Sequence, residues 1–220
     1  MGCDPSPRPV AVGDRRNRAS RIAPPRLESV AFPAVSTRLA LLSEQLNEAF
    51  ARIHERVQGL TDDEFFWEPV PDCWTVRRDE RGHWAADYPE PPHPVPAPFT
   101  TIGWRLVHVG ESKLMYHEYA YGPATLTFPD IDSAHTAADA IASLEEGHRL
   151  LAGDLSRLRD PDLDRAVLTN WGEEWPAWRI FWTMIDHDVH HGAEIGALRD
   201  LYRVSGGARL ATRPTIARGA

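Results

Sequence analysis

Two histidines four residues apart are the strongest chemical signal in the sequence. His187 and His191 bound the segment His-Asp-Val-His-His. On an α-helix, side chains at this spacing are neighbours, about 5–6 Å apart at Cβ, and can bind one metal ion. Their helical row is otherwise apolar, and each unmet ring nitrogen in a core costs roughly 1–3 kcal/mol. The pattern favours a metal site, and the alternative is a pair of ordinary surface or hydrogen-bonded histidines.

A third ligand has to come from another helix. His108 lies in the middle of a second helical segment, on one row with Trp104 and Met115. Three protein ligands leave one position of the ion open to substrate, as in catalytic zinc sites. We therefore predict that His108, His187 and His191 bind one divalent metal ion, with Trp104 and Met115 lining the substrate site.

Other polar residues could support this chemistry. Glu194 follows His187 by seven residues, nearly on the same helical face, so it could hold a ligand in place or act as a base. The alternative is a solvated glutamate. His190 is turned away from the pair and is interpreted as a surface or supporting residue. His148 lies on the apolar row of another helix and is interpreted as a core or pocket histidine.

Aromatic side chains precede the histidine pair, and they could wall an apolar pocket or fill the end of the fold. They are Trp171, Trp175, Trp178, Phe181 and Trp182. Among them, Trp178 is a candidate for substrate contact. Cys73 has no activating neighbour in the sequence, so we expect it to pack in the fold or lie on the surface rather than react.

Four amphipathic segments must position these residues. Apolar side chains recur at steps of three and four, which predicts helices over residues 36–59, 100–121, 133–160 and 175–203. The run Thr61–Glu64 predicts a capping box that opens a single turn. No convincing strand pair is seen, so the expected fold is an all-α, antiparallel four-helix bundle over residues 31–205. A long, proline-rich, extended loop is expected between the first two helices, at about residues 68–99.

Composition sets the remaining expectations. Residues 1–30 and 206–220 are predicted to be a disordered leader and tail, and both are rich in arginine. The net charge is −8, and residues 31–203 alone carry −14, which disfavours nucleic-acid binding. No apolar run is long enough to span a membrane, and only two cysteines occur. We expect a cytoplasmic protein.

These motifs resemble the DinB-like superfamily of metal-binding four-helix bundles. The segment from His187 through Gly192 to Leu198-Arg199 resembles the last helix of that family, which shows His-x-x-x-His, then Gly, an apolar pair and Leu-Arg. His108 has its counterpart in the family's second helix. Phe66-Trp67-Glu-Pro69, followed by Cys73-Trp74-Thr75-Val76, resembles the family's Trp-x-Pro…Trp-Ser/Thr-Val link. The resemblance covers residues 36–203, with a longer proline-rich segment between residues 77 and 100 than the family usually has.

The resemblance implies a function. In the superfamily, three histidines bind a divalent metal such as zinc or nickel, and several members are thiol S-transferases or isomerases that use bacillithiol, mycothiol or glutathione. It therefore implies transfer of a low-molecular-weight thiol to a small electrophile. High arginine and low lysine content is typical of GC-rich genomes, and actinobacteria of that kind use mycothiol. The alternatives are a non-catalytic metal-containing stress or small-molecule-binding protein and, third, a metal-dependent hydrolase with Glu194 as base. A homodimer is a further expectation.

Overall fold

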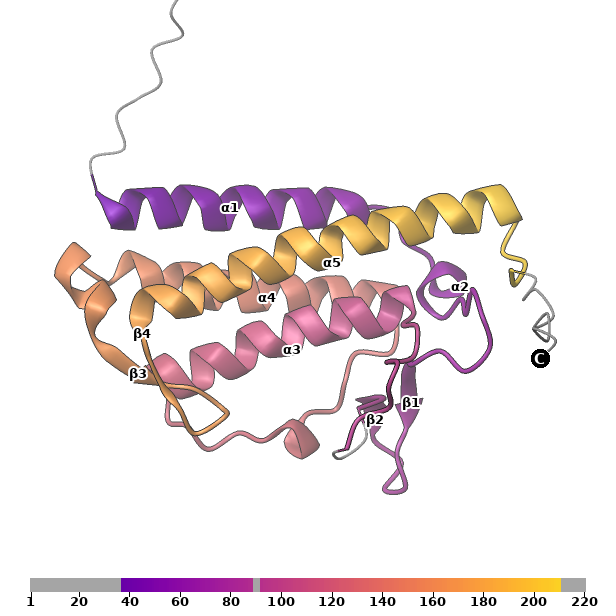
Figure 1. Cartoon of the computed structure of the whole chain (residues 1–220), viewed down its shortest axis with the longest axis horizontal. Helices are drawn as coiled ribbons and strands as arrows, with labels where there is room; N and C mark the ends of the chain where they lie inside the picture. Colours follow the sequence, from indigo (N-terminus) through magenta and orange to yellow (C-terminus); the bar gives the residue numbers. More distant parts are fainter. Residues whose placement is uncertain (1–36, 89–91, 211–220) are drawn as a thin grey trace, which may run out of the picture. The chain divides into compact units, whose positions relative to one another are not determined.

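Four long helices dominate the computed structural model, which describes residues 37–88 and 92–210. They are α1 (Arg38–Val57), α3 (Ile102–Tyr121), α4 (Ala137–Ser156) and α5 (Ala177–Ser205) (Figure 1). The shorter elements are α2 (Asp62–Phe65), β1 (Val76–Arg78), β2 (Trp84–Ala86), η1 (Phe128–Asp130), η2 (Asp160–Asp164), β3 (Ala166–Leu168) and β4 (Glu174–Pro176). The predicted four-helix fold is confirmed. The predicted leader, residues 89–91 of the loop and residues 211–220 of the tail lie outside the described residues.

The four helices form two parallel pairs. α1 runs in the same direction as α5, because Ile53 lies against Gly192 and Arg56 against Gly196. Gly192 follows directly after His191, and a Cβ there would come within 3.1 Å of the Ile53 Cβ. The two helices therefore approach closely where α5 carries the histidines.

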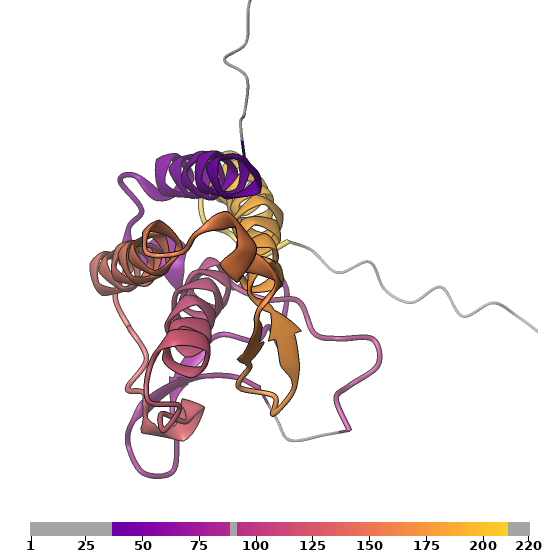
Figure 2. The same ribbon diagram turned by 90° about the vertical axis from the view of Figure 1, so that its left-hand side faces the viewer.

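The second pair, α3 and α4, runs in the opposite direction. Gly110 faces Ser143 and Gly147 faces Lys113, so α3 and α4 are parallel to each other. Between the pairs, Lys113 bonds to Asp188 of α5, which places α3 against the histidine-bearing helix. Figure 2 looks along the bundle and shows the four long helices end-on. Because α3 and α4 run the same way, residues 122–136 must return along the length of the bundle.

Threonine side chains cap the first three long helices. Thr37, Thr101 and Thr136 each accept a hydrogen bond from the backbone N–H three residues later. Such a cap contributes about 0.5–2 kcal/mol. The predicted start of α4 at Asp132 or Ser133 is wrong by about one turn. These two residues instead bond to the backbone of Trp84, which ties the return segment to β2.

Two short hairpins correct the expectation that no strands occur. β1 pairs antiparallel with β2, and β3 pairs antiparallel with β4. The turns contain Gly82 and Gly172, both at positive φ, a conformation that glycine adopts without steric cost. The first hairpin lies inside the segment expected to be an irregular loop, whereas residues 92–99 form no helix or strand. Three-residue strands are too short to display a period in the sequence.

The core consists of leucine, isoleucine and aromatic side chains from all four long helices. Fully buried members include Ile53, Leu106, Leu144, Ile180 and Met184.

The predicted capping box is present, with Thr61 and Glu64 bonding each other's backbone. Of the predicted tail, residues 206–210 contact the segment after α2, where Leu210 N–H donates to the Pro69 carbonyl. Within the described residues, no helix combines the length and apolar character that crossing a bilayer requires.

Candidate metal centre

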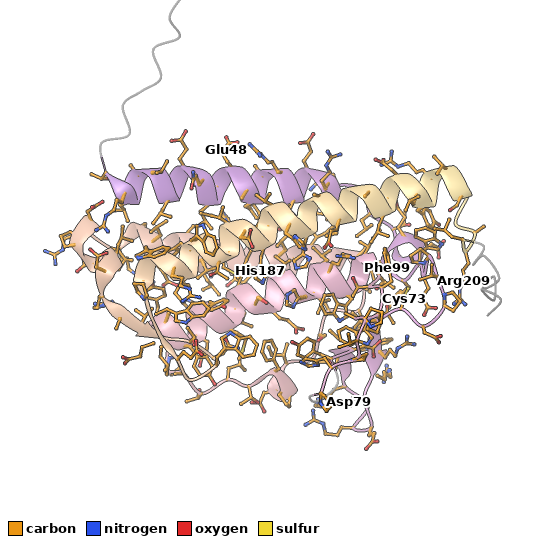
Figure 3. All side chains as sticks on the ribbon, in the orientation of Figure 1. Glu48, Cys73, Asp79, Phe99, His187 and Arg209 are labelled. Atoms are coloured by element: carbon orange, nitrogen blue, oxygen red, sulfur yellow. The ribbon has the colours of Figure 1, made fainter. Side chains whose placement is uncertain are left out.

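Helices α3 and α5 bring three histidines together. The ring nitrogens of His108, His187 and His191 that face one another all lie within 4.8 Å. The ring centroid of His108 lies 5.5 Å from that of His187 and 5.2 Å from that of His191. His187, labelled in Figure 3, lies midway along α5 where that helix packs on α3. The three rings form a cluster that could hold one metal ion.

The second ring nitrogen is occupied in two of these histidines. His187 Nδ1–H donates to the Thr183 carbonyl at 2.9 Å, and His191 Nδ1–H donates to the Glu194 carboxylate at 2.8 Å. In a neutral imidazole this leaves the Nε2 lone pair free. Both rings are therefore held in the tautomer in which Nε2 can bind a metal.

Stacking fixes the third ring. The Trp104 indole lies parallel to His108, with centroids 4.9 Å apart and planes within 15°. Trp104 is itself anchored, because its Nε1–H donates to the Asp87 carbonyl at 2.7 Å, just after β2. The segment after the first hairpin therefore holds Trp104 in place, and Trp104 in turn positions the His108 ring. Sequence analysis had predicted Trp104 as a substrate-site residue.

Burial keeps the three imidazoles neutral. It lowers the pKa of His108 to about 4 and that of His191 to about 2, and neighbouring histidine charge adds to the effect. Burial also lowers the pKa of His187. Metal ligands must be deprotonated, so all three rings are ready to bind at neutral pH. Three neutral imidazoles, two of them with hydrogen-bonded outer nitrogens, could hold one divalent metal ion.

Glu194 is held by its neighbours and is not free to act as a base. Its carboxylate accepts from His191 and pairs with Arg105 of α3, and its other oxygen lies 3.4 Å from His190 Nε2. The structure thus brings Glu194 to the outer side of His191. Arg105 was missed by sequence analysis, since one arginine on an amphipathic helix normally indicates a solvated face.

A buried ion pair lies next to the cluster. Lys113 Nζ donates to Asp188 at 2.6 Å, and both side chains are entirely buried. Burial lowers the pKa of Lys113 and raises that of Asp188, since each loses the hydration of its charge. Asp188 directly follows His187, so the pair fixes this turn of α5 on α3. Sequence analysis assigned neither residue a role.

The remaining candidates occupy different places. Met115 is buried two turns after His108, whereas Trp178 is half-exposed and lies nine residues before His187, about 13 Å along the axis of α5. The structure therefore does not bring Trp178 to the cluster. His148 packs at the α1–α4 contact, where its ring stacks on Phe50 at 3.9 Å.

Cys73 and the other aromatic residues lie outside the cluster as well. The Cys73 thiol donates to the Val70 carbonyl, and burial raises its pKa, which disfavours the reactive thiolate. Phe181 is fully buried in the core, but Trp171 and Trp182 are exposed. The aromatic set is thus divided between core and surface.

Comparison with known proteins identifies the family. The chain is similar to a crystal structure of a DinB-like protein from Bacillus cereus ATCC 10987, with 15% identity and a TM-score of 0.49 over 78% of this chain and 95% of that one. No curated protein sequence matches the chain. The family model of the DinB superfamily matches residues 45–195, which include all three histidines and most of the bundle. The chain therefore belongs to the DinB superfamily.

Proposed function

We propose that this protein is a metal-dependent thiol S-transferase that joins a low-molecular-weight thiol, such as mycothiol, to a small electrophile. The observation that carries the proposal is the set of three neutral imidazoles on α3 and α5. Their facing nitrogens lie within 4.8 Å, and the outer nitrogens of two of them are hydrogen-bonded. His108, His187 and His191 would hold the ion, and among the described residues no fourth histidine joins this set.

A zinc or nickel ion held there would act as a Lewis acid that lowers the pKa of a thiol. In the transfer, the thiol loses its proton to solvent, and its sulfur forms a bond to an electrophilic carbon. The bond from that carbon to the leaving group breaks, and the leaving group keeps the electron pair. The Trp104 indole stacks on His108 and provides an apolar neighbour for the cluster, which suits a small organic electrophile.

The bonding of Glu194 favours thiol transfer over hydrolysis. A hydrolase needs a free base beside the open position to take a proton from water. Glu194 is an acidic residue of α5 that bonds a histidine of the cluster, but it already accepts from His191 and pairs with Arg105. A thiol needs less help from such a base, because its pKa lies much closer to neutral than that of water.

The first experiment measures bound metal in protein purified without a histidine tag. We expect about one equivalent of zinc or nickel in the wild type and in His148→Ala, a histidine outside the cluster. Loss of the metal is expected in His108→Ala, His187→Ala and His191→Ala. Wild-type protein without metal, even after reconstitution, would contradict the proposal.

The second experiment tests turnover. Metal-loaded protein is mixed with a thiol and a chromogenic electrophile, 1-chloro-2,4-dinitrobenzene, and thioether formation is followed by absorbance. We expect a rate above background that disappears in His187→Ala. Metal binding without turnover for any of a panel of thiols and electrophiles would instead support a non-catalytic metal-containing binding protein.

A further inference from the structure

Arg105 carries a positive charge at the edge of the histidine cluster. The guanidinium pairs with the same Glu194 oxygen that accepts from His191, which places its charge close to that ring. It comes from α3, one turn before His108, and pairs with Glu194 of α5. Arg105 therefore bridges the two helices that form the cluster.

The hydrogen-bonding capacity of Arg105 is mostly unused. A guanidinium has five N–H groups, and Arg105 donates to Glu194 through one terminal nitrogen. Its Nε is buried and has no acceptor in the described structure. The residue is only 9% exposed, so water satisfies it poorly. A buried arginine with spare donors is suited to a bidentate carboxylate.

The charge balance also favours an anion. An imidazole that binds a metal is neutral, and Arg105 and Glu194 cancel each other. The buried Lys113 and Asp188 likewise cancel. On the proposed function, a divalent ion leaves the site with two positive charges, and a thiol that loses its proton supplies one negative charge. One further negative group on a substrate would complete the balance.

The aromatic ring of Phe99 lies near the Arg105 guanidinium. The guanidinium lies 5.6 Å from the centroid of the Phe99 ring, and this ring is 44% exposed. Phe99, labelled in Figure 3, lies just before α3, so it approaches Arg105 from the loop side. An aromatic face keeps water away from an ion pair formed next to it, and this strengthens the pair.

We propose that Arg105 binds a carboxylate of the small-molecule substrate in a subsite beside the metal. This inference rests on the proposed function and narrows its substrate class to molecules that carry an anionic group. The carboxylate belongs either to the thiol or to the electrophile. Both sources use the same chemistry, a two-point contact with the spare donors of the guanidinium.

The test compares matched ligands on zinc-loaded protein by calorimetric titration. One pair is 3-mercaptopropionate and 3-mercapto-1-propanol, which differ in the carboxylate. The other pair is maleate and dimethyl maleate, two electrophiles that differ in the same way. We expect the charged member of one pair to bind at least about tenfold more tightly, as is typical of a charge-assisted hydrogen bond. The pair that shows the preference identifies the source of the carboxylate.

Variants assign the preference to Arg105. Arg105→Gln should abolish it, Arg105→Lys should keep part of it, and Arg52→Gln, an exposed arginine on α1, should leave it unchanged. The ratio within each pair cancels effects of the substitution on the metal itself. No preference in the wild type for either pair would overturn the inference without any variant. A preference that survives in Arg105→Gln would overturn it as well.

The outcome separates this inference from the proposed function. If the thiols bind the zinc-loaded protein but neither matched pair shows a preference for its charged member, the carboxylate subsite is wrong and thiol transfer still stands. If neither thiol binds and neither is consumed, the proposed function is wrong, and the inference fails with it.

Discussion

Lys113 and Asp188 form a 2.6 Å ion pair between α3 and α5 with no exposure of either side chain. Removing one partner would leave the other charge buried and unpaired, which typically costs about 3–5 kcal/mol. We predict that Lys113→Met lowers the free energy of unfolding by this amount in urea denaturation of the metal-free protein. The double variant Lys113→Met/Asp188→Leu should recover most of the loss, because two apolar side chains can replace a buried pair. A single variant as stable as wild type would contradict this account.

Glu194 orients His191, so its removal should weaken metal binding. Glu194→Gln replaces the charged acceptor of the His191 Nδ1–H and leaves Arg105 without its partner. Loss of such an outer partner typically reduces metal affinity 10–100-fold. We expect a drop of about that size in zinc affinity, measured by competition with a chromogenic chelator. Glu48→Gln, on the exposed face of α1, is the control, and equal affinities in the two variants would refute the role.

The stability of the metal-free protein should rise with pH between about 4 and 6.5. The folded-state pKa values of His108 and His191 lie below the unfolded value near 6.5, so the unfolded chain binds more protons in this range. Each histidine then adds up to about 1.4 kcal/mol per pH unit, and above pH 6.5 its contribution is constant. Urea denaturation in the presence of a chelator measures the slope. His108→Gln should reduce this slope of stability against pH, whereas Arg52→Gln should leave the slope unchanged.

Two glycines should respond in opposite ways to alanine. At Gly192 a Cβ would lie 3.1 Å from the Ile53 Cβ, so α1 and α5 must separate slightly, which typically costs about 1–3 kcal/mol. At Gly153, in α4, the nearest atom is 3.5 Å away at the flexible end of Arg157. There the higher helix propensity of alanine should add up to about 1 kcal/mol. Thermal unfolding of Gly192→Ala and Gly153→Ala tests the pair, and shifts of the same sign would contradict the close contact.

The sequence allowed much of the fold to be predicted because long helices repeat their pattern. Steps of three and four identified the four segments. The spacing of His187 and His191, with His108 on a second helix, identified the residues that the structure brings together. Asp188 and Arg105 could not be recognised in this way, because a charged side chain on a helix normally indicates solvent. Only the neighbouring helix shows that each has a partner of opposite charge.

The elements that failed prediction depend on contacts between distant segments. β1 and β2 contain three residues each, so neither displays a period, and Trp84 lies 48 residues from its partner Asp132. That contact also explains why α4 begins at Ala137. The local sequence does not distinguish an Asp132 that caps a helix from an Asp132 that bonds to a distant strand.

The parallel arrangement of α1 and α5 affects how the chain could be rearranged. α1 begins at one end of the bundle and α5 finishes at the other, so Thr37 and Gly206 lie at opposite ends (Figure 1). With α5 of 29 residues rising about 1.5 Å per residue, joining them means covering roughly 40 Å. A linker of at least about 12 extended residues would be needed. Circular permutation, which succeeds most easily where chain ends are close, would therefore require a long designed connection, whereas fusion partners attached at the two ends would stay well separated.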